Sequence, residues 1–162
     1  MAKLCRAKLK RQLFMKEIAE AEKARISRGS LLFEKGNTFE VDSSNPGKSD
    51  LGLRNKMFDG VTDVFAWESK RGSKERWFEL NFRKRPPKFS KIGIYGFNVD
   101  QPTVRIWKFG EWKTLTPKKT DKAKYSIVLD FGEELKSVKI RIDFAVKDRR
   151  DQVELYEIEL LK

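Results

Sequence analysis

Histidine is absent from this 162-residue chain, and cysteine occurs only once, as Cys5. Without histidine the chain lacks the commonest general base and the commonest zinc ligand. A single cysteine cannot form an internal disulfide, so packing must stabilise the fold, and synthesis in a reducing compartment is favoured. A zinc or iron–sulfur site within one chain is therefore not expected.

Long hydrophobic runs are also missing. The first residues, MAKLCRAKLKRQLFMKEIAEAEK, carry positive charge but no uninterrupted apolar core of the kind that a signal peptide needs. No stretch approaches the length of a membrane span. We therefore expect cytoplasmic synthesis, no secretion by a signal peptide, and no membrane span.

Positive charge is abundant instead. Lysine and arginine number 36 against 24 aspartates and glutamates, which gives a formal net charge of +12. The length suits one domain with a real core. The charge favours a polyanion or an acidic protein face as a partner, although a basic surface without a dedicated partner remains the alternative.

The amino-terminal segment is the most basic part of the chain. Residues 3–28 contain no glycine or proline, are rich in good helix formers and precede Gly29, which predicts an α-helix. Nine basic and three acidic residues in positions 1–29 give +6, half of the total charge. Because the first cations lie at the positive end of the helix dipole, an external anion would stabilise them.

We therefore predict that segment 1–29 docks into a larger assembly of proteins. The alternative is a helix whose apolar stripe packs across its own domain. The expected docking side chains are the early cations and part of the stripe: Lys3, Arg6, Lys8, Lys10, Arg11, Phe14 and Ile18.

From residue 30 onward the apolar pattern has period two, with Gly, Pro, Asn and Asp punctuation, which is typical of a β-sandwich or barrel. The expected strands are 31–33, 38–41, 77–82, 91–95, 103–107, 112–115, 125–130, 138–144 and 153–160. Alternation assigns two sets of side chains to the core: Phe78, Leu80 and Phe82, and then Val138, Ile140, Ile142 and Phe144.

The last strand changes phase. Val153 and Leu155 do not alternate in register with Tyr156, Ile158 and Leu160. We therefore expect a β-bulge, or a change of sheet, near this point.

The stretch FDGVTDVFAWES, residues 58–69, reads as a turn in front of a strand. Asp59-Gly60 permits a tight reversal, and the Asp carboxylate and the Thr62 hydroxyl can accept hydrogen bonds from loop amides. Trp67 is then expected to cap one end of the sandwich.

This turn is followed in order by RWFELNF, KIGIYGF, PTVRIW with GEWKTL, VKIRIDF and QVELYEIELL. The ordered set resembles the galactose-binding-like superfamily, especially discoidin or coagulation-factor C-type modules, over residues 30–162. The resemblance implies a mainly β, jelly-roll β-sandwich, with residues 1–29 forming a separate basic helix. It also implies a structural calcium in which Asp59, Thr62 and Glu157 would supply oxygen ligands.

No catalytic set is recognisable, so an enzyme is not expected. The leading hypothesis is a non-enzymatic interaction module in a larger assembly, because intracellular relatives work in protein complexes and similar sandwiches occur in phage tail, baseplate and capsid-decorating proteins. A virion is therefore one expected location.

Two alternatives stay open. Carbohydrate binding at the loop end of the sandwich would use aromatic stacking and hydrogen bonds from Trp67, Arg85, Trp107 and Trp112, although the last two indoles are more simply explained by packing across their own hairpin. Nucleic-acid binding would use the basic helix and the basic loops: RKRPPK at 83–88, with Lys118, Lys119, Lys122 and Lys124.

Overall fold

The computed structural model describes residues 38–45, 67–148 and 150–162, which form strands and connecting turns without a helix. No helix long and apolar enough to cross a membrane occurs among these residues. The strands are β1 (Thr38–Ser43), β2 (Trp67–Glu68), β3 (Trp77–Lys84), β4 (Lys88–Phe97), β5 (Pro102–Lys108), β6 (Glu111–Thr114), β7 (Lys119–Ala123), β8 (Ser126–Lys136), β9 (Lys139–Phe144) and β10 (Glu154–Leu161).

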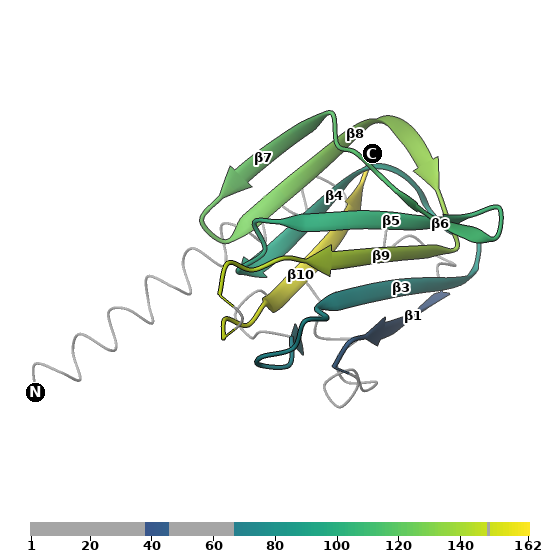
Figure 1. The fold of residues 1–162 in the computed structure, drawn as a ribbon. Helices are drawn as coiled ribbons and strands as arrows, with labels where there is room; N and C mark the ends of the chain where they lie inside the picture. The colour runs from purple at the N-terminus through teal and green to yellow at the C-terminus, as the bar shows by residue number, and fades with distance from the viewer. Residues whose placement is uncertain (1–37, 46–66, 149) are drawn as a thin grey trace, which may run out of the picture.

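The strands form two five-stranded sheets. Sheet A has the order β1-β3-β9-β5-β6, and sheet B has the order β2-β10-β4-β8-β7. Every pairing is antiparallel. Figure 1 shows the two sheets as layers, with β3, β9 and β5 of sheet A lying across β4 and β10 of sheet B.

The core lies between the layers and draws on both. Alternate residues of the central strands β3, β5, β8 and β9 are mostly buried, as the period-two pattern predicts, and they belong to one contiguous cluster. Sheet A contributes Phe78, Leu80, Phe82, Val104, Ile106, Ile140, Ile142 and Phe144, and sheet B contributes Ile92, Ile94, Ile127, Leu129, Ile158 and Leu160.

One predicted core residue is misplaced. Val138 is 45% exposed because it lies in the turn before β9, where its carbonyl accepts a hydrogen bond from Phe82 N at 2.8 Å. The neighbouring Ser137 is buried instead, and its hydroxyl contacts the backbone N and O of Trp107 at 3.1 and 2.8 Å. The prediction for Val138 is therefore wrong, whereas those for Ile140, Ile142 and Phe144 are confirmed.

The bulge predicted in the last strand is confirmed. The register between β10 and β4 shifts between Leu155 and Glu157, so Tyr156 is the extra residue. The strands approach closely here: a Cβ on Gly96 would lie 2.0 Å from the carbonyl oxygen of Glu154. Only glycine fits at position 96, and this close approach orients the start of β10.

Two strands were missed by the sequence pattern. β2 has only two residues and pairs with β10 through Trp67 and Glu68. β7, KTDKA, contains no large apolar residue and is exposed along its whole length, so nothing in its own sequence marks it as a strand. It forms at the edge of sheet B by pairing with β8.

The two ends of the sandwich differ in their connections. The "loop end" carries the connections β2–β3, β4–β5, β7–β8 and β9–β10. The pairings Trp77↔Asp143, Pro102↔Phe144 and Phe97↔Glu154 place the ends of these strands together. At the opposite "turn end" lie the short β3–β4, β5–β6 and β8–β9 connections.

Several predictions fall outside the described residues. They include the helix at 3–28 and its docking side chains, namely Lys3, Arg6, Lys8, Lys10, Arg11, Phe14 and Ile18. The strand at 31–33 and the turn residues Asp59 and Thr62 lie outside the described residues as well. The division of the chain at residue 29 therefore stays a prediction.

Candidate functional site

The loop end is held together by hydrogen bonds between its connections. Ser69 N donates to Val153 O at 2.9 Å, and Val153 N donates to the Ser69 hydroxyl at 3.0 Å. The Gln152 side chain donates to Ser69 O at 2.9 Å, while Asn98 Nδ2 donates to Gln152 O at 2.8 Å. Three loops are thereby fixed to one another, so side chains they carry are positioned before any ligand arrives.

Aromatic side chains are exposed at this end. Phe97, the last residue of β4, is 48% exposed, and Tyr125, in the β7–β8 turn, is 41% exposed. Gly96 N donates to Tyr125 O at 2.8 Å, which links the turn to the end of β4. Exposed rings on a rigid base are suited to stacking against an apolar ligand face.

Tyr156 completes this group from the bulge in β10. Its hydroxyl donates to Glu154 Oε2 at 3.3 Å. Burial raises the pKa of Tyr156 to about 12, with further contributions from the Glu154 charge and hydrogen bond and from Tyr125. Tyr125 and Tyr156 are thus electrostatic neighbours, and the Tyr156 phenol stays protonated and able to donate a hydrogen bond at neutral pH.

A polar pocket of about 180 Å³ lies at the same end, and its lining begins at Asn98, the residue after Phe97. The β4–β5 loop supplies Asn98, Asp100 and Gln101, and the β9–β10 loop supplies Ala145, Val146, Lys147 and Asp151. Asn98 has a φ of 58°, a left-handed conformation that asparagine tolerates, and this turns the chain into the pocket wall. Amide, carboxylate and ammonium groups together offer donors and acceptors of the kind that sugar hydroxyls need.

Trp67, a predicted ligand residue, lies in the core. Its side chain is 1% exposed, its ring packs edge-on to Phe78 with a centroid distance of 5.8 Å, and its Nε1 donates to the Ser43 hydroxyl at 2.9 Å. The packing role predicted for this indole agrees with its position. No face of the ring is open to a ligand.

The other three predicted ligand residues lie at the turn end, away from the loop-end pocket. Trp107 and Trp112 are paired across the β5–β6 hairpin, with ring centroids 5.3 Å apart and an angle of 75° between them. Arg85 is exposed in the β3–β4 turn. The structure therefore brings the two indoles together but separates them from the loop-end aromatic residues.

The predicted calcium site has one ligand among the described residues. Glu157 is fully buried in β10, and a buried carboxylate is a suitable oxygen ligand for calcium. Asp59 and Thr62 lie outside the described residues. Within the described ranges, no group of three or more Asp, Glu, Cys or His side chains is placed to hold a metal. Calcium stays a prediction that depends on Glu157.

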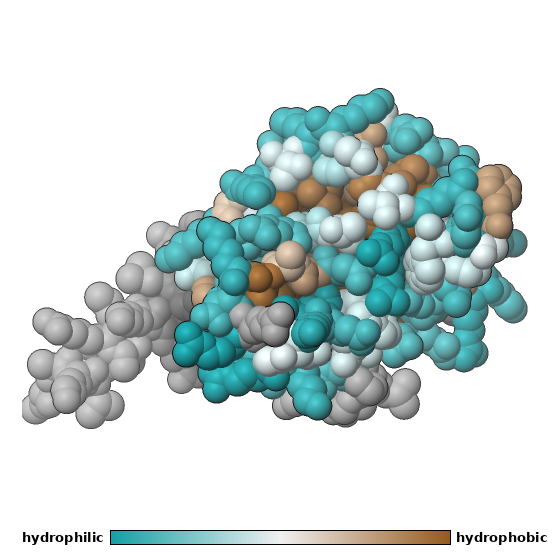
Figure 2. Space-filling view, viewed as in Figure 1, coloured by the Kyte–Doolittle hydropathy of each residue, from teal (hydrophilic) through white to brown (hydrophobic). Residues whose placement is uncertain are grey.

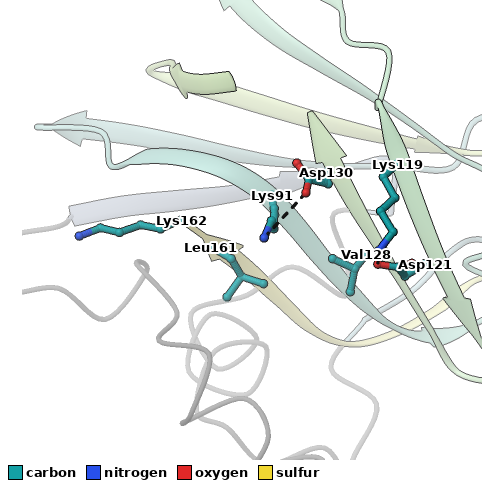
Figure 3. A pocket seen from close by; sticks show the side chains of 7 residues that line it. All are labelled: Lys91, Lys119, Asp121, Val128, Asp130, Leu161 and Lys162. Atoms are coloured by element: carbon teal, nitrogen blue, oxygen red, sulfur yellow. Dashed lines mark ion pairs between the residues drawn. The ribbon is translucent and has the colours of Figure 1, made fainter. Parts of the chain in front are cut away.

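A larger hollow, of about 360 Å³, lies on the outer face of sheet B (Figure 3). Lys91 faces Asp130 at 3.8 Å, and Lys119 faces Asp121 at 3.1 Å. The other lining residues are Val128, Leu161 and Lys162. Among the described residues no aromatic ring lines this hollow, and Lys91 and Lys119 lie beside carboxylates. The hollow is therefore less suited to a sugar than the loop end is.

The basic loops predicted to contact nucleic acid lie on different parts of the described structure, and the basic helix lies outside it. Residues 83–88 span the end of β3, the turn and the start of β4 at the turn end, whereas Lys119 and Lys122 lie on the edge strand β7. Lys124 lies at the loop end, with its Nζ 5.0 Å from the Tyr125 ring centroid. The described part of the structure thus offers no continuous basic track built from these segments.

Comparison with known proteins gives matches by structure alone. No protein-family model matches the chain, and no curated protein sequence does. The structure is similar to CpGH89CBM32-6 from Clostridium perfringens, with a TM-score of 0.61 and 17% identity over 83% of this chain and 99% of that one.

Two further solved structures are similar. A pectin-binding carbohydrate-binding module has a TM-score of 0.53 and 19% identity, covering 74% of this chain and 87% of that one. The family 32 carbohydrate-binding module of Clostridium perfringens NanJ, solved with galactose, has a TM-score of 0.54 and 15% identity, covering 78% of this chain and 93% of that one. This chain has the fold of these modules. The resemblance read from its motifs is confirmed at the level of the fold.

The loop-end side chains were missed by sequence reasoning. In the sequence, Phe97 and Tyr125 look like ordinary strand residues. Their exposure becomes clear only in the structure, which places Phe97 at the end of β4 and Tyr125 in the turn before β8. Tyr156 had a usable signal, because the phase change at 155–156 predicted the bulge that displaces it from the core pattern.

Proposed function

We propose that this protein is a non-catalytic carbohydrate-binding module that holds a glycan at the loop end. The observation that carries the proposal is that exposed aromatic rings and a polar pocket lie at the same end of the sandwich, where hydrogen bonds hold the loops together. Phe97 and Tyr125 supply apolar faces for a sugar ring, and the pocket supplies hydrogen-bonding groups for its hydroxyls.

Similar structures support this proposal over the assembly role. One similar module was solved with galactose, and another from Clostridium perfringens was solved with GalNAc-β-1,3-galactose. At sequence identities of 15% and 11%, the similarity supports a shared fold but not a shared ligand. The sugar that is bound must therefore depend on this chain's own loops. Docking through residues 1–29 stays a prediction, because that segment lies outside the described residues.

The proposed architecture is a jelly-roll sandwich over residues 30–162, with the basic helix predicted at 3–28 as a separate element. In this arrangement the sandwich is a rigid platform, and the loops at one end determine specificity. The proposal includes no chemical step, since binding by stacking and hydrogen bonding needs no nucleophile or general base.

A glycan array followed by calorimetry tests the proposal. We expect binding to one class of glycan, and we expect the double substitution Phe97→Ala with Tyr125→Ala to weaken it by about tenfold or more, which is the loss of roughly 1.4 kcal/mol. Val138→Ala is the control, because Val138 is an exposed apolar residue at the opposite end and lies outside the proposed site. Absence of glycan binding, or equal binding by the loop-end double variant, would contradict the proposal.

A further inference from the structure

The β5–β6 hairpin at the turn end has an unusual apex. Lys108 pairs with Glu111, so the turn consists of Phe109 and Gly110 only. Their φ values are 54° and 82°, which define a mirror-image type I′ turn. Asparagine or glycine is favoured at the first of these positions, and a bulky residue there is strained. Phenylalanine is thus kept where local stability favours another residue.

The ring of Phe109 projects into solvent. It is 86% exposed, the highest value among the large hydrophobic residues that the structure shows as exposed. Figure 2 shows an apolar group at the edge of the molecule over this hairpin, separated by hydrophilic groups from the apolar band in the middle of the same face. Neither folding nor packing accounts for this ring, because the fold gains nothing from burying it.

Cations surround the ring. The Nζ atoms of Lys108 and Lys113 each lie 5.5 Å from its centroid. Glu111 offsets part of this charge, with its Oε1 3.6 Å from Lys113 Nζ. Behind the apex, Lys139 Nζ lies 5.6 Å from the Trp107 ring. The hairpin therefore presents an exposed aromatic ring with two ammonium groups over it.

We propose that this turn-end hairpin is a second binding site, for an acidic polysaccharide built from uronic acids. A uronate ring has an apolar face that can stack on Phe109 and a carboxylate at its edge that can pair with a neighbouring lysine. A polymer of such rings would also reach the Trp107–Trp112 pair and Lys139. The site is independent of the loop end, and its ligand differs by carrying charge.

Single-stranded nucleic acid is the competing occupant, since bases also stack on aromatic residues beside cations. The geometry favours the uronate. In a nucleotide the ribose separates the stacked base from the phosphate, whereas the lysines here lie over the ring, close to where the carboxylate of a stacked uronate would be. The site is also a projecting apex, and not the basic groove that follows a nucleic-acid backbone.

The test uses Phe109→Asn, because asparagine is favoured in the left-handed conformation. We expect this variant to melt at a higher temperature than the wild type and to bind polygalacturonate about tenfold more weakly by calorimetry. A rise in melting temperature together with a loss of binding separates this site from a structural defect. Val138→Ala changes an exposed apolar residue at the same end but outside the hairpin, so it is the matched control and should bind polygalacturonate as the wild type does. The loop-end double variant, Phe97→Ala with Tyr125→Ala, is measured alongside.

Charge variants and probes complete the experiment. Lys108→Gln with Lys113→Gln should weaken polygalacturonate binding and flatten its dependence on salt, and Glu111→Gln should strengthen it. Neutral galactan should not compete. Unchanged polygalacturonate binding by Phe109→Asn, or a preference for oligo-dT over polygalacturonate, would overturn the inference. Loss of polygalacturonate binding only in the loop-end variant would also overturn it, while leaving the proposed loop-end function standing.

Discussion

The two ends of the sandwich both expose aromatic side chains, but they do so by different means. At the loop end, Phe97 at the end of β4 and Tyr125 in the β7–β8 turn are held by hydrogen bonds that join Gly96 to Tyr125 and Asn98 to the β9–β10 loop. At the turn end, Phe109 stands on a two-residue turn and is held only by its own hairpin. The loop end is shaped by long-range contacts, and the turn end by local backbone conformation.

This difference has a consequence for ligand chemistry. The loop-end pocket mixes Asp100 and Asp151 with Lys147 and neutral amides, which suits hydroxyl groups. The turn-end hairpin places lysines against an aromatic ring, which suits a carboxylate. One fold thus supports two surfaces of different charge character, because antiparallel strands send alternate connections to opposite ends.

Among substitutions of glycine, the largest expected loss of stability is at the loop end. Gly96→Val places side-chain atoms where a Cβ alone would lie 2.0 Å from the Glu154 carbonyl oxygen. We expect a loss of about 3 kcal/mol or more in the free energy of unfolding, because β4 and β10 must separate. Urea denaturation measures this loss.

Gly110→Ala is the control at the turn end. Gly110 has a φ of 82° and nothing within 4 Å of a built Cβ, so only the backbone conformation opposes a side chain. We expect a cost of about 1 kcal/mol. Equal losses of unfolding free energy in Gly96→Val and Gly110→Ala would show that close packing does not constrain the loop end more than the turn end.

Calcium removal should have the next largest effect, if the buried Glu157 is a ligand as the family resemblance implies. Saturating calcium at 100 times its dissociation constant would stabilise the protein by about 2.7 kcal/mol, so EGTA should lower the melting temperature. Glu157→Gln should abolish this response, and magnesium should not replace calcium. Identical melting curves with calcium and with EGTA would eliminate the metal.

A smaller effect is expected from Trp112→Ala in the turn-end hairpin. The edge-to-face contact with Trp107 should contribute about 1 kcal/mol beyond the area that it buries. By contrast, Trp67→Ala should cost about 3–5 kcal/mol, because Trp67 is buried in the core. Thermal or chemical denaturation measures the loss of unfolding free energy in both variants. Similar losses would mean that the Trp107–Trp112 pair is part of the core.

The smallest effect is confined to alkaline pH. Tyr156 has its pKa raised from 10.0 to about 12, so the folded state holds the phenolic proton more tightly than the unfolded state does. The resulting stabilisation is present below pH 10 and is lost as the pH rises from 10 to about 12.

Ultraviolet difference titration of the wild type and of Tyr156→Phe identifies this group. Glu154→Gln should lower the pKa of Tyr156, because it removes a negative charge and weakens the hydrogen bond. An unchanged Tyr156 titration in Glu154→Gln would show that burial alone raises its pKa.

Much of the fold could be predicted from local pattern. Alternation identified the inward faces of β3 and β9, apart from Val138, and the phase change near Leu155 located the bulge. β7 could not be predicted, because KTDKA has no apolar face and pairs only because β8 offers it an edge. The candidate site was less predictable still, since the four residues chosen from the sequence lie in the core or at the turn end.

By itself, then, the sequence determined the class of fold and most of its core, because the period-two burial of side chains is written along each strand. Tertiary structure decided which exposed side chains become neighbours. Phe97, Tyr125 and Tyr156 are separated by 28 and 31 residues along the chain and come to one end only through the pairing of β4 with β8 and β10. The physical reason is that burial is a property of each residue within its strand, whereas a binding surface depends on strand order and register.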